Sequence, residues 1–179
     1  MNLPNLLTLL RIILVPVIII FLIQESYKEA LLTFVIAGLT DIFDGLLARS
    51  LNKQTKLGAF IDPMADKLLL ASSFVSLSVI GLIPSWLTVI VISRDFIIVL
   101  GMIILSMMSI KYEIKPALIS KATTAFQLST IFFALLDKVI HYDINSQWLI
   151  ILCWVTAAFT VASGFAYIMR GIKYINHVS

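Results

Sequence analysis

Apolar residues fill long runs of this chain, and short polar segments divide them into six stretches. A helix needs about 20 largely apolar residues to cross the hydrocarbon core of a bilayer. We therefore expect transmembrane helices near residues 6–23, 30–50, 59–80, 85–109, 116–136 and 147–169. Arg11 lies near the start of the first stretch, so its opening turns are expected in the membrane interface. The pattern predicts an all-α integral membrane protein with six transmembrane helices and an interfacial N-terminal helical start.

The composition supports a membrane protein of one domain. Of the 179 residues, 60% are hydrophobic and only 13% are charged, and a water-soluble domain of this size could not bury so much apolar surface. No internal repeat, low-complexity tract or flexible linker divides the chain, so residues 1–179 are predicted to form one domain. No small-x-small cleavage site closes the apolar start, so we expect it to be retained. The one cysteine, Cys153, is expected to pack in an apolar core.

Lysine and arginine residues in the loops predict the orientation in the membrane, because cytoplasmic loops carry an excess of both. One side receives Arg49, Lys53, Lys56, Lys111, Lys115, Arg170 and Lys173, and the other receives Lys28 and Lys138. We therefore expect both termini on the cytoplasmic side of the cell (inner) membrane. The net charge of +3 suggests only contact with anionic lipid, and no nucleic-acid partner is expected.

The segment 41–67, DIFDGLLARSLNKQTKLGAFIDPMADK, holds four of the ten acidic residues between long apolar runs. Asp41 and Asp44 are three residues apart and Asp62 and Asp66 are four apart, so each pair lies on one helix face. Two such pairs on helices joined by a short loop can converge on one point. Four carboxylates would repel one another without a cation, and their oxygens suit Mg²⁺, Mn²⁺ or Ca²⁺. The segment contains no Cys or His, which argues against zinc.

Small residues and an arginine accompany the carboxylates. Gly45 and Ala48 leave one helix face open to a flat group, and Arg49 can bind a phosphate with its planar guanidinium. Gly58 precedes the second acidic pair, and Pro63 is expected in the first turn of the third helix. Carboxylates, a divalent cation, an arginine and a close-approach glycine together indicate a site for a pyrophosphate or a phosphodiester.

The order Asp41, Asp44-Gly45, Ala48-Arg49, Gly58, Asp62 and Asp66 resembles the signature of the CDP-alcohol phosphatidyltransferases at every fixed position. The resemblance implies a six-helix membrane bundle that forms a homodimer, takes a phosphatidyl group from CDP-diacylglycerol, transfers it to an alcohol and releases CMP. It also implies two Mg²⁺ or Mn²⁺ ions bound by the four aspartates, with Asp66 additionally acting as general base. The residues expected to bind CDP-diacylglycerol are Gly45, Ala48, Arg49 and Gly58.

Two other interpretations of the acidic segment remain open. The aspartates could form structural ion pairs with neighbouring cations, although four membrane-embedded carboxylates exceed the cations able to reach them. They could instead form the ion site of a cation transporter, although the spans show no inverted repeat. Asn5, Thr8 and Arg11 form a polar stripe on the first helix, which either lies wetted in the interface or borders the active-site mouth.

Candidate acceptor-binding residues lie in the second half of the chain. Arg94 and Asp95 are in the middle of the fourth stretch, about 100° apart around the helix, so they need not pair with each other. Each could find a partner inside the bundle, or Arg94 could bind a phosphate of the acceptor. Lys121 could complete a basic pocket with Arg94, and so could Lys115, for which a solvated loop charge is the simpler interpretation.

The acceptor alcohol is open between two branches of the family. The opening NLPNLLTLLRIILVPV is similar to phosphatidylglycerophosphate synthases, which use glycerol 3-phosphate. The segments VISRDF and KPALISKATTAFQL look more like CMP-forming cardiolipin synthases, which use phosphatidylglycerol. Thr123 stands where the first branch usually has a second lysine, which weakens the assignment to glycerol 3-phosphate without excluding it. We place glycerol 3-phosphate narrowly first because that branch is the commoner one.

Overall fold

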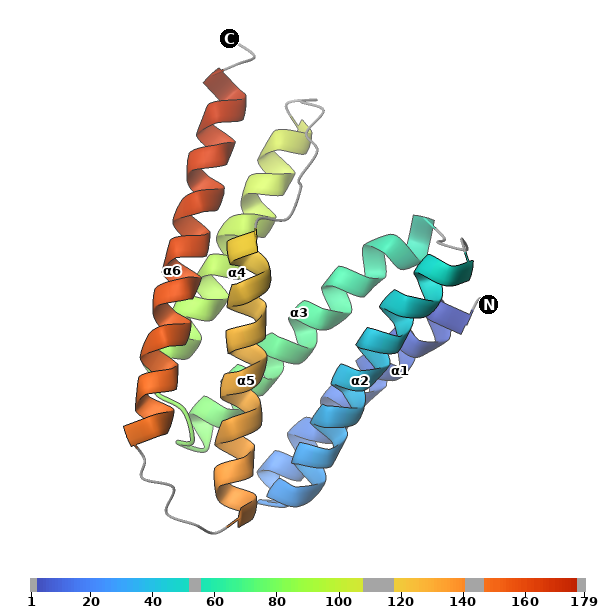
Figure 1. Cartoon of the computed structure of the whole chain (residues 1–179), viewed down its shortest axis with the longest axis vertical. Coiled ribbons are helices and arrows are strands. Elements are labelled where there is room, and N and C mark those ends of the chain that lie inside the picture. The colour runs from blue at the N-terminus through green and yellow to red at the C-terminus, as the bar shows by residue number, and fades with distance from the viewer. Residues whose placement is uncertain (1–2, 52–55, 108–117, 141–146, 177–179) are drawn as a thin grey trace. The chain divides into compact units, whose positions relative to one another are not determined.

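The computed structural model describes the backbone of residues 3–51, 56–107, 118–140 and 147–176, and the side chains of residues 9–40, 64–101, 103, 118–140 and 147–172. The described backbone forms six α-helices, as predicted (Figure 1). They are α1 (Leu3–Ile23), α2 (Tyr27–Leu51), α3 (Lys56–Val79), α4 (Ser85–Met107), α5 (Leu118–Ile140) and α6 (Gln147–Asn176).

The start of α3 differs from the prediction. The helix begins at Lys56, so Gly58 and Pro63 lie inside it and Pro63 is not in its first turn. Proline lacks an N–H group, which removes one hydrogen bond from the helix interior, and an interior glycine costs about 1 kcal/mol. Backbone polar groups in apolar surroundings must be satisfied within the segment, so continuing the helix is favoured over exposing them.

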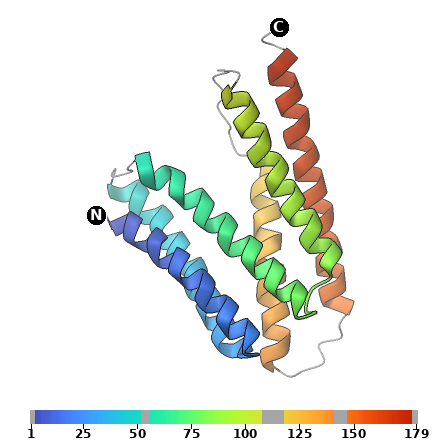
Figure 2. The ribbon, with the colours of Figure 1, turned by 180° about the vertical axis from the view of Figure 1, so that it is seen from behind.

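The chain divides into two compact units, and the first comprises Met1–Ile83 and Ile131–Ile144. In this unit α1 packs against both α2 and α3 (Figure 2). A short turn joins α1 to α2, with Glu25 in the left-handed region at φ 57° and the Ser26 amide donating to the carbonyl of Phe21. Phe34 and Phe74 are buried in the apolar core of this unit.

The second unit comprises Pro84–Thr130 and Asn145–Ser179. Within it α4 packs against α6, and hydrogen bonds tie α5 to α6. The hydroxyls of Thr130 and Thr156 lie 2.8 Å apart, and Gln127 Nε2 donates to Thr160 Oγ1 at 3.4 Å. Cys153 is fully buried, which confirms its predicted role in packing.

Many large apolar side chains face outward in both units. Val79 is 81% exposed and Trp148 is 71% exposed, whereas Arg11 and Gln127 are each only 1% exposed. Within the described part of the chain, two helical segments are long and apolar enough to cross a membrane, Leu118–Ile140 and Gln147–Ile172. An apolar exterior around buried polar groups is the distribution expected of helices in a bilayer, so it supports the predicted all-α membrane protein.

Candidate functional site

The four predicted metal ligands lie on α2 and α3. Asp41 and Asp44 belong to the C-terminal part of α2, whereas Asp62 and Asp66 belong to α3. The structure describes only the Asp66 side chain among them, so the convergence of the four carboxylates stays a prediction. The side chains at Gly45, Ala48, Arg49 and Gly58 also lie outside the described residues, and Lys115 lies outside them altogether.

Asp66 is held by an arginine from another helix. Arg11 Nη1 of α1 donates to Asp66 Oδ1 of α3, across 55 residues of sequence. The Arg11 side chain is 1% exposed, so the explanation of Arg11 as a wetted interfacial residue is wrong. The Asp66 side chain is 41% exposed and remains accessible. The pair therefore joins a buried guanidinium to a carboxylate at the surface of the unit.

The local sequence explains why this contact forms. Arg11 lies within TLLRIILV, an apolar run that offers no acidic partner on α1. A charged group at membrane depth is costly unless it is paired, and a carboxylate on a packed neighbouring helix supplies the pair. Because α1 packs against α3, Asp66 lies within reach.

The donor chemistry fits a hard divalent cation. Carboxylate oxygens are the ligands that Mg²⁺ and Mn²⁺ prefer, and the candidate set consists of aspartates alone. Among the described side chains, no three His, Cys, Asp or Glu residues cluster as a metal site would require. Three of the four candidate ligands are outside that description, so the metal site remains a prediction from the sequence.

Arg94 lies in a polar network inside the second unit. Its Nη1 donates to Asp95 Oδ1 at 2.5 Å, and its Nη2 donates to Ser120 Oγ at 2.8 Å and to Ser163 Oγ at 2.9 Å. Its guanidinium carbon is 5.9 Å from the centroid of the Tyr167 ring. Arg94 and Asp95 thus pair directly, and Arg94 has partners on α5 and α6 as well as on its own helix.

This network bears on the predicted acceptor pocket. Arg94 is 7% exposed, and its Nε has no hydrogen-bond partner among the described residues. Lys121 follows Ser120 directly at the start of α5, and its side chain is exposed. The structure thus brings Arg94 to the N-terminal end of α5, near Lys121. Binding of an acceptor phosphate there stays a prediction.

Thr123 has a role that the sequence did not indicate. It is completely buried, and its hydroxyl is 2.8 Å from the carbonyl oxygen of Ile119 and 3.0 Å from that of Phe159 on α6. The rings of Phe126 and Phe159 also meet at this contact, with centroids 4.5 Å apart. The side chain at position 123 therefore points into the α5–α6 interface.

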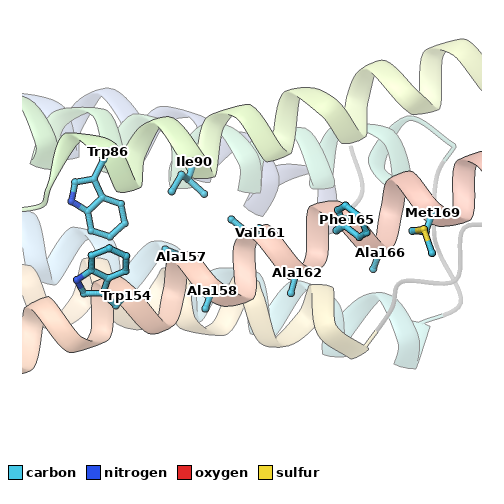
Figure 3. Close-up of a pocket in the computed structure, with 10 residues that line it drawn as sticks. All are labelled: Trp86, Ile90, Trp154, Ala157, Ala158, Val161, Ala162, Phe165, Ala166 and Met169. Atoms are coloured by element: carbon cyan, nitrogen blue, oxygen red, sulfur yellow. The ribbon is translucent and has the colours of Figure 1, made fainter.

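An apolar pocket of about 1080 Å³ lies between α4 and α6 (Figure 3). The Trp86 and Trp154 rings meet at one end, with centroids 4.7 Å apart, and Met169 lies at the other. Its lining consists of Trp86, Ile90, Trp154, Ala157, Ala158, Val161, Ala162, Phe165, Ala166 and Met169. These side chains include no carboxylate or cation that could bind a metal ion or a phosphate, so this pocket is not the candidate active site.

Two structural features were not predicted from the sequence, although the sequence contains a signal for each. The contact between Arg11 and Asp66 could have been sought because a lone arginine in an apolar run requires a counterion. The α5–α6 interface could have been read from polar residues at helical spacing within apolar helices. These residues are Thr123, Gln127 and Thr130 on α5 and Thr156, Thr160 and Ser163 on α6.

Comparison with known proteins gives a family match and several relatives. Residues 1–162 match the family described as CDP-alcohol phosphatidyltransferase. The chain is 36% identical over 190 residues to the cardiolipin synthase (CMP-forming) of Homo sapiens, covering 97% of this chain and 63% of that protein. It therefore spans just under two thirds of that relative.

Two bacterial relatives are similar in length to this chain, and both are called CDP-diacylglycerol–glycerol-3-phosphate 3-phosphatidyltransferase. The protein of Bacillus subtilis (strain 168) is 32% identical over 184 residues, covering 94% of each chain. The protein of Aquifex aeolicus (strain VF5) is 33% identical over 183 residues, covering 98% of each chain. The relatives thus carry two different activities in their names at similar identity.

Proposed function

Because this chain belongs to the CDP-alcohol phosphatidyltransferase family, we propose that it transfers a phosphatidyl group from CDP-diacylglycerol to an alcohol and releases CMP. The family match confirms the resemblance inferred from segment 41–67. The observation that carries the proposal is that the matched residues, 1–162, contain the whole acidic segment. An enzyme is favoured over the alternative of a cation transporter for the same reason.

The proposed reaction is a displacement at the β-phosphorus of CDP-diacylglycerol. A bond forms between this phosphorus and the acceptor oxygen, and the bond to the bridging pyrophosphate oxygen breaks, so that oxygen leaves with CMP. Mg²⁺ or Mn²⁺ held by Asp41, Asp44, Asp62 and Asp66 would neutralise charge on the pyrophosphate.

The chain's own residues would orient the substrates and move the proton. Asp66 would take the proton of the acceptor hydroxyl, and its 41% exposed side chain is accessible for this step. Arg49 would bind the donor phosphates through its planar guanidinium. Gly45, Ala48 and Gly58 would leave room for the cytidine.

Glycerol 3-phosphate is the acceptor that we propose first. The two bacterial relatives named for this acceptor match nearly the whole length of both chains. Arg94 and Lys121 would bind its phosphate at the N-terminal end of α5. The Thr123 hydroxyl faces α6, so the usual second lysine at this position would have to enter a helix interface in this chain. The lack of that lysine is therefore a weak argument against glycerol 3-phosphate here.

Phosphatidylglycerol is the second candidate acceptor, which would make the chain a CMP-forming cardiolipin synthase. The observation that favours it is the 36% identity to the human cardiolipin synthase over 97% of this chain. The segments VISRDF and KPALISKATTAFQL, which contain Arg94 and Lys121, support the same branch.

The proposal also covers the setting of the reaction. We expect the active site and both termini on the cytoplasmic side, where the loops are richer in lysine and arginine. We also expect a homodimer, as the family resemblance implies, and crosslinking in native membranes would test it.

The deciding experiment measures CMP release by purified protein in detergent with CDP-diacylglycerol and Mg²⁺ or Mn²⁺. Glycerol 3-phosphate and phosphatidylglycerol are offered separately. Release with only one of them identifies the acceptor, and a chelator should abolish release until metal is returned. Asp41→Asn and Asp66→Asn should remain folded and lose nearly all transfer. Absence of CMP with both acceptors, or wild-type turnover in either variant, would refute the assignment.

A further inference from the structure

The two members of the Arg11–Asp66 ion pair differ in exposure, which a purely structural pair does not require. The guanidinium is 1% exposed, whereas the carboxylate side chain is 41% exposed. A partner that stays partly exposed can neutralise a buried charge without the full desolvation cost of a second buried ion. Here the fixed member is the arginine, and the member that remains accessible is the carboxylate. In this arrangement Arg11 can hold the Asp66 carboxylate in place while the carboxylate stays accessible to a ligand.

Apolar side chains flank Asp66 on α3. Its neighbours Ala65, Leu69 and Leu70 on α3 are buried apolar residues that offer no side-chain hydrogen bond. Arg11 supplies a directional donor from α1, through a hydrogen bond from Nη1 to Asp66 Oδ1. Its positive charge also opposes binding of a divalent cation by the same carboxylate.

We propose that Arg11 is a positioning residue, which orients the Asp66 carboxylate toward the acceptor hydroxyl and limits its engagement with the bound cation. The inference rests on the proposed function, in which Asp66 takes the proton of that hydroxyl. A general base needs an oxygen in hydrogen-bonding reach of the proton, and a carboxylate bound entirely by metal would not provide one. Arg11 acts through Asp66 and does not itself touch the reacting atoms.

Two substitutions separate the geometry of Arg11 from its charge. Arg11→Lys keeps the charge but moves the donor, because the lysine side chain is shorter, so kcat should fall by roughly 10-fold or more while Mn²⁺ affinity stays close to the wild-type value. Arg11→Gln removes the charge as well, so kcat should fall by about 100-fold or more. The same variant should bind Mn²⁺ several-fold more tightly, because a repelling charge has been lost.

The measurements are made on the full chain in detergent. CMP release at saturating substrates gives kcat, and electron paramagnetic resonance of free Mn²⁺ gives the metal affinity independently of turnover. Ser73→Ala is the matched control, because Ser73 lies seven residues after Asp66 on α3 and is 1% exposed. Its hydroxyl has no hydrogen-bond partner among the described residues. The control should match wild type in kcat and in Mn²⁺ affinity.

The outcomes are distinct. Opposite movements of kcat and Mn²⁺ affinity in Arg11→Gln would support the proposal, because simple loss of structure lowers both. A wild-type kcat in Arg11→Lys, or a joint fall of kcat and Mn²⁺ affinity in Arg11→Gln, would overturn it while leaving the proposed function intact. If Arg11→Gln fails to fold, Arg11→Lys alone decides. A wild-type protein that releases no CMP with either acceptor would overturn the proposed function itself.

Discussion

The role inferred for Thr123 changes once the structure shows where its side chain points. In the sequence it stands where a lysine would add charge to an acceptor pocket. In the structure its hydroxyl lies between the carbonyl oxygens of Ile119 and Phe159 and joins α5 to α6. Helical periodicity places residues on faces of a helix, but it does not reveal which neighbouring helix covers a given face. That information comes from tertiary packing.

We predict that Thr123→Val destabilises the protein and leaves its acceptor preference unchanged. Interhelical hydrogen bonds in membrane proteins contribute about 1 kcal/mol, so a modest fall in the midpoint of thermal unfolding in detergent is expected. Thr124→Val is the matched control, since the Thr124 hydroxyl lies 3.2 Å from the carbonyl oxygen of Ser120 within α5 itself. Equal destabilisation by the two substitutions, or a switch of acceptor in Thr123→Val, would contradict this role.

For the four aspartates, the sequence predicts a site but not the residues that contact them. Their spacing of three and four residues and their isolation among apolar runs are enough to predict a site. The partner of Asp66 could not be predicted in this way, because Arg11 lies 55 residues earlier in the chain. Only the packing of α1 against α3 brings the two side chains together.

Helices α4, α5 and α6 are connected by one side chain. Arg94 of α4 donates through Nη2 to Ser120 of α5 and to Ser163 of α6, and its Nη1 pairs with Asp95. The Arg94 and Asp95 side chains are 8% and 16% exposed. A paired charge that connects three helices contributes to the stability of the unit, and truncation of either partner removes the opposite charge from the other.

We predict that Arg94→Gln lowers the free energy of unfolding by about 3 kcal/mol, because it leaves the Asp95 carboxylate without its guanidinium. Adding Asp95→Asn to the same chain should restore much of the loss. Unfolding in a detergent–SDS titration, run as a double-mutant cycle, measures the coupling. Independent, additive losses would argue against the pair.

The same double variant tests the predicted acceptor site. If Arg94 binds the acceptor phosphate, the Arg94→Gln/Asp95→Asn protein should show a raised KM for the acceptor and an unchanged KM for CDP-diacylglycerol. Unchanged KM values for both substrates would make Arg94 a structural residue alone.

At the scale of elements, the sequence predicts that each helix exists, but it predicts less well where each helix begins and ends. Long apolar runs identified all six helices because backbone groups in a bilayer must be satisfied within each segment. The start of α3 differs from the prediction because Gly58 and Pro63, which usually mark a helix boundary, lie inside this helix. Helix α2 starts at Tyr27, before the predicted Ala30. The reason is related, because the turn at Glu25 uses fewer residues than the charged segment that was predicted to be a loop.

Orientation in the membrane is a property of the whole molecule. It is predicted from the distribution of lysine and arginine among loops, and it would place the acidic ends of α2 and α3 at the cytoplasmic face. Cys153 is the only cysteine in the sequence and is buried, so introduced cysteines can be labelled selectively in a Cys153→Ala background.

We predict that Glu25→Cys reacts with a membrane-impermeant maleimide in intact spheroplasts, whereas Gln54→Cys reacts only after lysis. Residue 25 lies in the turn between α1 and α2, and residue 54 lies between α2 and α3 on the side richer in basic residues. Gel-shift detection of the label gives the result directly. The reverse pattern would invert the topology and separate the acidic segment from the cytoplasm.

The Arg11–Asp66 contact also has a consequence for biosynthesis. The arginine is synthesised 55 residues before its counterion, so α1 leaves the ribosome with a positive charge in its apolar run and no carboxylate to neutralise it. Deep burial of this guanidinium is favourable only after α3 has been made. We therefore expect α1 to reach its final depth in the membrane only once α3 is present to pack against it.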